Sequence, residues 1–233
     1  MSASPPDPSS TAPAPTPTRD LVLTLGLVAA ICGLVIVAAY QGTYDAVATN
    51  RRIALERSVF RVIPRATSIV EYRALPAGGI EPAATGEAVP GAIRFFAAYD
   101  AAGRLAGVAA EGSAKGYADS VRILFGYQPD CQCITGIGVV SMRETPGIGD
   151  KIVTDEAFLA NFRALDARLD AELAGLAHAI RTVKHGTKKD AWQIDAISGA
   201  TITSRAVGKA IDDSARALLP RLVPHLETLK EKK

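Results

Sequence analysis

An unbroken apolar segment constrains this chain more than any other feature. Residues 21–40, LVLTLGLVAAICGLVIVAAY, carry no charged side chain. At a helical rise of about 1.5 Å per residue, a segment of this length spans a bilayer core of about 30 Å. We therefore expect a transmembrane helix here, and a chain that works at a membrane.

A cleavable signal peptide and a buried core helix are the alternatives for this segment. The apolar part of a signal peptide runs to about 7–15 residues, which is shorter than this one. Ala46-Val47-Ala48 nevertheless resembles a small-residue cleavage site, so the signal-peptide alternative stays open. A buried core helix is disfavoured, because a wholly apolar run of this length bounded by Arg19 and Asp20 is atypical of a soluble core.

Basic residues do not fix the orientation of the expected transmembrane helix. Arg19 precedes it, whereas Arg51, Arg52 and Arg57 follow it. A literal count favours a cytoplasmic C-terminal domain, but long domains translocate largely regardless of charge.

Chain length and composition indicate one anchor and one domain. A chain of 233 residues is too short for two large cores. The predicted parts are a disordered tail over 1–20, the transmembrane helix over 21–40, a helical stalk over 41–64, a domain over 65–222 and a polar tail over 223–233.

Within the domain, short apolar runs separated by turn residues predict strands over 92–99, 105–110, 120–127, 134–142 and 179–184. Helices are expected over 155–162, over 165–177, where four leucines recur at helical spacing, and over 204–219. A loop rich in Gly, Pro and Ala is expected over 76–90. The predicted fold class is α/β, an antiparallel or mixed sheet flanked by helices.

The loop before the last helix has the character of a phosphate site. Residues 195–204 read DAISGATITS, with small side chains that let a ligand approach the backbone. The free N–H groups at a helix start suit an anion, and Thr201, Thr203 and Ser204 add hydroxyl donors. The alternative is structural: Thr203 or Ser204 caps the helix and Gly199 serves a turn.

The string Asp195-x-x-Ser198-Gly199-Ala200-Thr201 resembles the flavinylation motif of the FMN-binding domain family. This resemblance implies that Thr201 is joined to the phosphate of FMN by a phosphoester bond. It further implies that a flavin transferase installs the FMN from FAD. Asp195 then serves either the transferase reaction or the order of the loop, and both roles stay open.

Two further segments extend the likeness over about residues 20–222. Residues 144–152, ETPGIGDKI, are similar to the ETPGLG segment of the G subunit of the Rnf electron-transport complex. Gly116-Tyr117 resembles the start of that family's GYSG segment, although Ala118-Asp119 and Met142-Arg143 depart from its pattern. The resemblance places Glu144, Thr145 and Gly147 at the FMN, while Tyr117 either stacks on the flavin ring or fills the core. The C subunit of the sodium-pumping NADH:quinone reductase is a related, less close match.

The resemblance implies an electron-carrying subunit rather than a stand-alone enzyme. It would belong to a membrane complex that couples ferredoxin and NAD redox chemistry to sodium or proton movement. Its partners would be the other membrane subunits, and its flavin domain would lie on the periplasmic side of the bacterial inner membrane. Two alternatives remain: the same module in another extracytoplasmic redox chain, and a non-redox, membrane-tethered scaffold subunit.

Several other functions are disfavoured by the sequence. A net charge of +2 gives no electrostatic support for a nucleic-acid partner. Walker, G-x-G-x-x-G and Ser–His–Asp patterns are absent, which argues against direct NADH binding. The cysteines, at 32, 131 and 133, are too few for a disulfide framework, and no metal site is expected. Cys131-x-Cys133 is a surface detail of a turn, a redox pair or part of a shared metal site.

Overall fold

The computed structural model describes residues 18–83 and 89–230 in two compact units, 1–51 and 52–233. Most of the predicted disordered tail lies outside the described residues. Helix α1, Thr18–Val62, covers the expected transmembrane helix and all but the last two residues of the expected stalk. All residues from 18 to 50 are exposed. Within the described part of the chain, α1 is the one helix long and apolar enough to cross a membrane.

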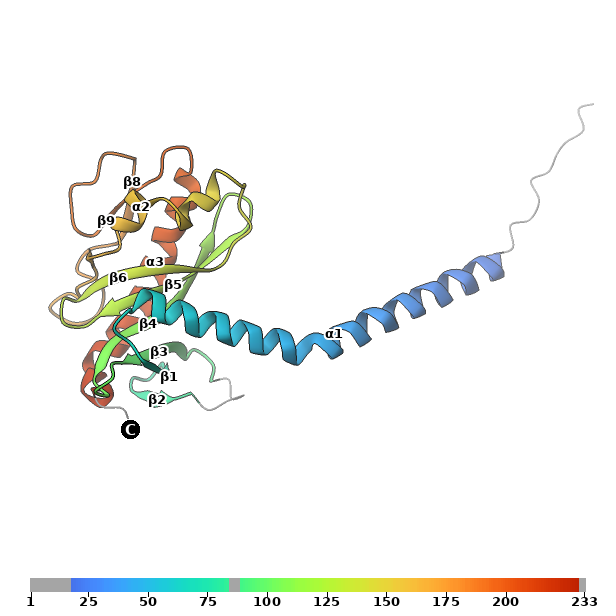
Figure 1. The fold of residues 1–233 in the computed structure, drawn as a ribbon, viewed down its shortest axis with the longest axis horizontal. Coiled ribbons are helices and arrows are strands. Elements are labelled where there is room, and N and C mark those ends of the chain that lie inside the picture. The colour runs from blue at the N-terminus through green and yellow to red at the C-terminus, as the bar shows by residue number, and fades with distance from the viewer. Residues whose placement is uncertain (1–17, 84–88, 231–233) are drawn as a thin grey trace, which may run out of the picture. The chain divides into compact units, whose positions relative to one another are not determined.

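The second unit is built on a seven-stranded antiparallel sheet in the order β2-β1-β3-β4-β5-β6-β7 (Figure 1). The strands are β1 Ser68–Ala74, β2 Ile80–Pro82, β3 Ile93–Tyr99, β4 Leu105–Lys115, β5 Ser120–Gln128, β6 Cys133–Ser141 and β7 Leu165–Asp166. A parallel pair, β8 Arg181–Val183 and β9 Gln193–Asp195, lies outside this sheet. The remaining elements are the 3-10 helices η1 Gly149–Val153 and η2 Val223–Leu229 and the α-helices α2 Glu156–Ala160 and α3 Thr201–Leu222. The expected α/β class is confirmed.

Both faces of the central strands are buried. In β3, Phe95 belongs to the core that includes the buried side of α3, and the next residue, Phe96, belongs to a second cluster. The second cluster is completed by the last turns of α1, including Val59 and Val62. Because successive strand residues point to opposite faces, the sheet separates these two cores. The long α3 therefore has a rigid support.

Helix α3 packs closely on β4 through Gly112. A Cβ atom at this position would collide with the backbone carbonyl of Ala210 in α3. The same helix approaches β8, where a Cβ on Gly208 would collide with the Thr182 hydroxyl. These contacts hold α3 against β4 and β8, and Thr201 is the first residue of this helix.

Two sequence expectations are wrong in this unit: the loop over 76–90, where β2 forms, and the helix over 165–177. Residues 165–177 form no helix: Leu165 starts β7, and a turn follows in which Asp170 Oδ1 accepts from Ala174 N at 2.8 Å. This turn brings Leu169 opposite Leu176 as an isolated bridge. Within the expected polar tail, residues 223–229 form η2, which buries Leu229.

Candidate functional site

Thr201 is the first residue of α3, directly after the loop that follows β9. Gly199 takes a φ of +84°, a left-handed conformation that glycine adopts without strain. The N-cap is Ala200, and no side chain caps the helix at this position. The alternative in which Thr203 or Ser204 caps α3 is therefore wrong, because the helix begins at Thr201, three residues before the expected start at Ser204.

The hydroxyls of Thr203 and Ser204 are used inside the protein. Both side chains are buried. Ser204 Oγ donates to Ala200 O at 2.9 Å and accepts from Ile197 N at 3.1 Å, which ties the loop back onto the helix. Thr203 Oγ1 donates to Glu144 Oε2 at 2.8 Å. Thr201 is only half-buried, so its hydroxyl is the one of the three best placed to react with a partner.

Glu144 joins three segments that are far apart in the sequence. Its carboxylate accepts from Thr203 Oγ1 at the start of α3 and from Ala118 N, at 3.2 Å, in the Gly116-Tyr117 loop. Gly149 lies against the same point, since a Cβ there would come 3.2 Å from Thr203 Oγ1. The structure thus brings together the three motifs singled out in the sequence, with Thr145 and Gly147 exposed on the same loop as Glu144.

Large apolar side chains are exposed on the three segments that Glu144 joins. Tyr117 is 68% exposed, Ile202 51% and Ile148 49%. Tyr117 therefore does not fill the core. Sequence reasoning missed Ile148 and Ile202, and nothing distinguished them from core residues before the fold was known. Exposed apolar groups on segments that meet at Glu144 are typical of a ligand or partner surface.

Asp195 holds the loop that precedes β9. Both of its carboxylate oxygens accept from Gly186 N, at 2.8 and 3.0 Å, and Oδ2 lies 3.5 Å from His185 Nδ1. The buried side chain of Asn161 fixes its backbone, accepting from Asp195 N at 3.0 Å and donating to Asp195 O at 3.3 Å. Lys188 Nζ donates to the same Asn161 oxygen at 3.0 Å. Burial lowers the pKa of Lys188, and the charge of Asp195 acts in the opposite direction. Asn161 and Lys188 were not anticipated from the sequence.

A cavity of about 400 Å³ opens beside this network. Its wall is apolar at Phe158 and Ile197 and polar at Lys151, His185 and Ser198. The volume falls in the range of small-molecule sites. Ser198 places the cavity next to the loop that leads to Thr201.

Comparison with known proteins identifies the family. Residues 116–216 match the model of the FMN-binding domain family. The G subunit of the ion-translocating oxidoreductase complex of Cereibacter sphaeroides is 31% identical over 186 residues, which cover 79% of this chain and 77% of the relative. The chain belongs to this G-subunit family. The G subunit of the Na⁺-translocating ferredoxin:NAD⁺ oxidoreductase complex of Acetobacterium woodii is 30% identical over 66% of this chain and 68% of the relative.

Other comparisons set the extent of the likeness. The G subunit of Pasteurella multocida is 39% identical over 108 residues, so the match spans about half the relative's length (48%). Among solved structures, Shewanella oneidensis NqrC superposes with a TM-score of 0.60 at 23% identity, covering 78% of this chain and 99% of that one. The C subunit of the Na⁺-translocating NADH-quinone reductase from Parabacteroides distasonis gives 0.56 at 18% identity, covering 79% of this chain and 96% of that one. These two show a shared fold.

The start of α3 in this member of the G-subunit family fits an FMN phosphate. The first turn of α3 contains no acidic residue, and its N-cap Ala200 offers no side-chain acceptor. Alanine is among the poorest N-caps, at a cost of about 1 kcal/mol relative to Ser or Asp. An anion at this position would supply the missing acceptor for the first backbone N–H groups. Ser198 and Gly199 are small and exposed, which lets a phosphate approach the loop before Thr201.

A metal site in the described part of the chain would need side chains that could bind a metal ion together. Among residues 18–83 and 89–230, no group of three or more His, Cys, Asp or Glu side chains is arranged to hold a metal ion. Cys131 and Cys133 are joined by a disulfide.

Proposed function

We propose that this chain is the electron-transfer flavoprotein subunit of a membrane-bound, Rnf-type complex, with FMN joined by a phosphoester to Thr201. The observation that carries the proposal is the uncapped start of α3 at Thr201, within the motif Asp195 to Thr201. The family match over 116–216 includes this position.

The residues around Thr201 have separate roles in this proposal. The Thr201 hydroxyl provides the oxygen of the phosphoester, and the first N–H groups of α3 bind the remaining phosphate oxygens. Glu144 positions the start of α3 through Thr203 rather than touching the phosphate, since two anions would repel each other. When bound, FMN supplies one- and two-electron redox chemistry, and the protein supplies position and electrostatics.

Contacts to the flavin ring would come from the exposed segments that Glu144 holds together. Tyr117 and Ile148 present apolar surface there, and Thr145 and Gly147 lie on the same loop as Ile148. Covering this surface with an aromatic ring would remove it from water, at about 25 cal/mol per Å² of apolar area. Asp195 would keep the loop in place for the transferase through its bonds to Gly186.

Names of relatives suggest the larger assembly. The Acetobacterium woodii relative is named as part of a Na⁺-translocating ferredoxin:NAD⁺ oxidoreductase complex. We infer that this chain works with other membrane subunits of such a complex and is matured by a flavin transferase. Coupling to sodium or proton movement would belong to the assembly.

We also infer a single-pass anchor in the bacterial inner membrane, with the flavin domain in the periplasm. The exposed apolar part of α1 supports the anchor. The Cys131–Cys133 disulfide supports the side, because disulfides persist in oxidising compartments and are rare in the cytosol. Proteinase K added to intact spheroplasts should then digest the domain. Protection until the membrane is lysed would place the domain in the cytoplasm.

In-gel fluorescence tests the flavin attachment. The full chain, coexpressed with a flavin transferase, should give a fluorescent band on a denaturing gel under ultraviolet light. Thr201→Val should be dark, whereas Thr201→Ser, which keeps the hydroxyl, should remain fluorescent. Thr228→Val is the matched control, because this exposed threonine donates to His225 O in η2, outside the proposed site, and it should still be labelled.

A dark wild-type band, with the transferase active on a control substrate, would refute the flavoprotein proposal and favour a non-redox scaffold. A fluorescent band would leave the choice between an Rnf-type complex and another extracytoplasmic redox chain, which copurification of partner subunits decides.

A further inference from the structure

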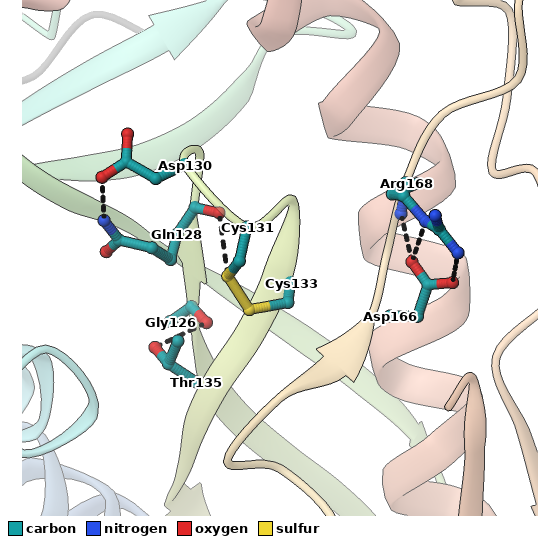
Figure 2. Close-up of a disulfide and its surroundings, with 8 residues drawn as sticks. All are labelled: Gly126, Gln128, Asp130, Cys131, Cys133, Thr135, Asp166 and Arg168. Atoms are coloured by element: carbon teal, nitrogen blue, oxygen red, sulfur yellow. Dashed lines mark hydrogen bonds and ion pairs between the residues drawn. A yellow bond between two sulfur atoms is a disulfide. The ribbon is translucent and has the colours of Figure 1, made fainter. Parts of the chain in front are cut away.

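The Cys131–Cys133 disulfide lies at the tip of the β5–β6 hairpin (Figure 2). Cys131 is exposed in the turn, whereas Cys133, the first residue of β6, is 6% exposed. The ring that the two sulfurs close contains one intervening residue, Gln132, whose φ is +49°. A non-glycine residue in this left-handed region is uncommon and carries a conformational cost.

Such a small ring makes a poor structural staple. A disulfide stabilises a fold mainly by restricting the unfolded chain, and this effect grows with the number of residues in the closed loop. Here the loop is close to the smallest possible, and its middle residue is in an unfavourable conformation. The stabilisation by the bond is therefore small, and the disulfide is easier to reduce than one that closes a long loop.

The hairpin is held by other bonds. Gln128 pairs with Cys133 at the end of the β5–β6 ladder, and Gln132 N donates to Pro129 O at 3.2 Å. Gln132 O accepts from Ala167 N at 3.0 Å, which attaches the chain beyond β7 to the same turn. None of these bonds involves sulfur, so the domain should remain folded when the disulfide is opened.

The surroundings of Cys131 also suit a free thiol. Its sulfur lies 3.6 Å from the carbonyl oxygen of Gln128 (Figure 2). A disulfide sulfur carries no proton, so this contact becomes an S–H···O hydrogen bond only in the dithiol form. The exposed turn gives an incoming thiolate access to the Cys131 sulfur and leaves Cys133 as the sheltered leaving group.

We propose that Cys131–Cys133 is a thiol–disulfide exchange site whose partner is a protein dithiol. A thiolate of the partner attacks Cys131 Sγ, forms a mixed disulfide and releases Cys133 as a thiolate, which takes up a proton. The partner's second thiol then loses its proton and attacks the partner sulfur that is bonded to Cys131. This closes a disulfide in the partner and releases Cys131, which takes up a proton to become a thiol. Two electrons and two protons thus pass from the partner dithiol to this chain, and the partner becomes a disulfide. The reverse sequence re-oxidises the pair.

This site is separate from the proposed flavin site. The Gly116-Tyr117 loop adjoins the Ser120 end of β5, through the bond from Gly116 N to Asp119 O, while the disulfide adjoins the Gln128 end. The nine residues of β5 are separated by eight steps of about 3.3 Å, which put these ends about 26 Å apart. The exchange partner is therefore a separate protein rather than the flavin, and the proposal goes beyond the electron-transfer function.

Redox titration of the full chain in detergent tests this site. A Cys32→Ala background removes the third cysteine, which lies in α1. The protein is equilibrated in glutathione redox buffers, and free thiols are then tagged with a maleimide-polyethylene glycol. Two tags should appear reversibly as the buffer becomes more reducing, with an unchanged circular dichroism spectrum. A pair that stays oxidised in every buffer, or a domain that unfolds on reduction, would show a static staple and overturn the proposal.

A trapping experiment tests the direction of attack. A reduced thioredoxin that lacks its resolving cysteine should form a mixed disulfide that maps to Cys131. In single-cysteine variants, the thiol of Cys133→Ser should react with an aromatic disulfide reagent about tenfold faster than that of Cys131→Ser, because only the former leaves the exposed sulfur. Trapping at Cys133, failure to trap at all, or equal rates for the two variants would refute the assigned roles.

Discussion

Glu144→Ala should loosen the junction between the three segments at Thr201. The substitution removes the acceptor for the Thr203 hydroxyl and for Ala118 N, whose distances to the carboxylate are 2.8 and 3.2 Å. A hydrogen bond to a charged group contributes about 1.5–3 kcal/mol in a protein interior. Glu144 is only half-buried and the second bond is long, so we expect a total loss of about 2 kcal/mol in the free energy of unfolding.

Partial variants separate the two bonds. Thr203→Val keeps the shape of a buried side chain and removes one bond, at an expected cost of about 1 kcal/mol. Glu144→Gln retains a single acceptor oxygen and should fall between Glu144→Ala and wild type. Because the two residues share one bond, the double variant Glu144→Ala/Thr203→Val should be less destabilised than the sum of the single changes, by about 0.5–1 kcal/mol.

Urea unfolding of the detergent-solubilised chain measures these differences. The single tryptophan, Trp192, stacks on His178 with ring centroids 3.8 Å apart and reports the transition. The matched control is Thr145→Ala, an exposed change on the same loop. If Glu144→Ala costs no more than this control, or if the double variant is simply additive, the carboxylate does not join the segments.

Three further predictions concern packing and pH. Gly112→Ala should lower the free energy of unfolding by about 2 kcal/mol or more, because the added Cβ meets the Ala210 carbonyl; a neutral result by urea unfolding would show that α3 can shift away from β4. Hydrogen bonds from the Arg168 side chain hold the pKa of Asp166 below its usual value, so this pair stabilises the fold above about pH 4 and the stabilisation is lost as the pH falls. The difference in Tm between wild type and Asp166→Asn should therefore shrink from pH 7 to pH 3. A constant difference would mean that the pair does not form. Burial raises the pKa of Tyr127 to about 12, so the free energy of unfolding should fall as the pH rises above 10.0, the ordinary pKa of tyrosine. Tyr127→Phe should reduce this loss of stability in unfolding curves measured over a series of pH values. An unchanged loss would mean that water reaches the phenol.

The sequence predicted the central strands correctly but predicted a helix over 165–177 that does not form. The four central strands were found because turn residues bound apolar runs that fit half-buried or buried strands. The leucines of 165–177 have helical spacing, yet Asp166 and Asp170 bind backbone N–H groups at Arg168 and Ala174. These local bonds compete with helix formation. Leu173 is left exposed as a result, so only part of the periodic pattern is core.

The candidate site was predictable in its parts and not in its connections. The motif at 195–201 and the segment at 144–152 were visible, because each is a continuous string. The bond between Glu144 and Thr203 spans 59 residues, and no local pattern signals it. No side chain caps α3 at Thr201, so no local signal in the sequence marked this helix start.

Peptide mass mapping tests the central claim most directly. The full chain, coexpressed with a flavin transferase, is digested, and the peptide that contains Thr201 is sequenced by mass spectrometry. We predict that this peptide is heavier by one FMN less one water, with fragment ions that assign the addition to Thr201. The corresponding peptide from Thr201→Val should have its unmodified mass. An unmodified wild-type peptide, or an FMN found on another residue, would contradict the account.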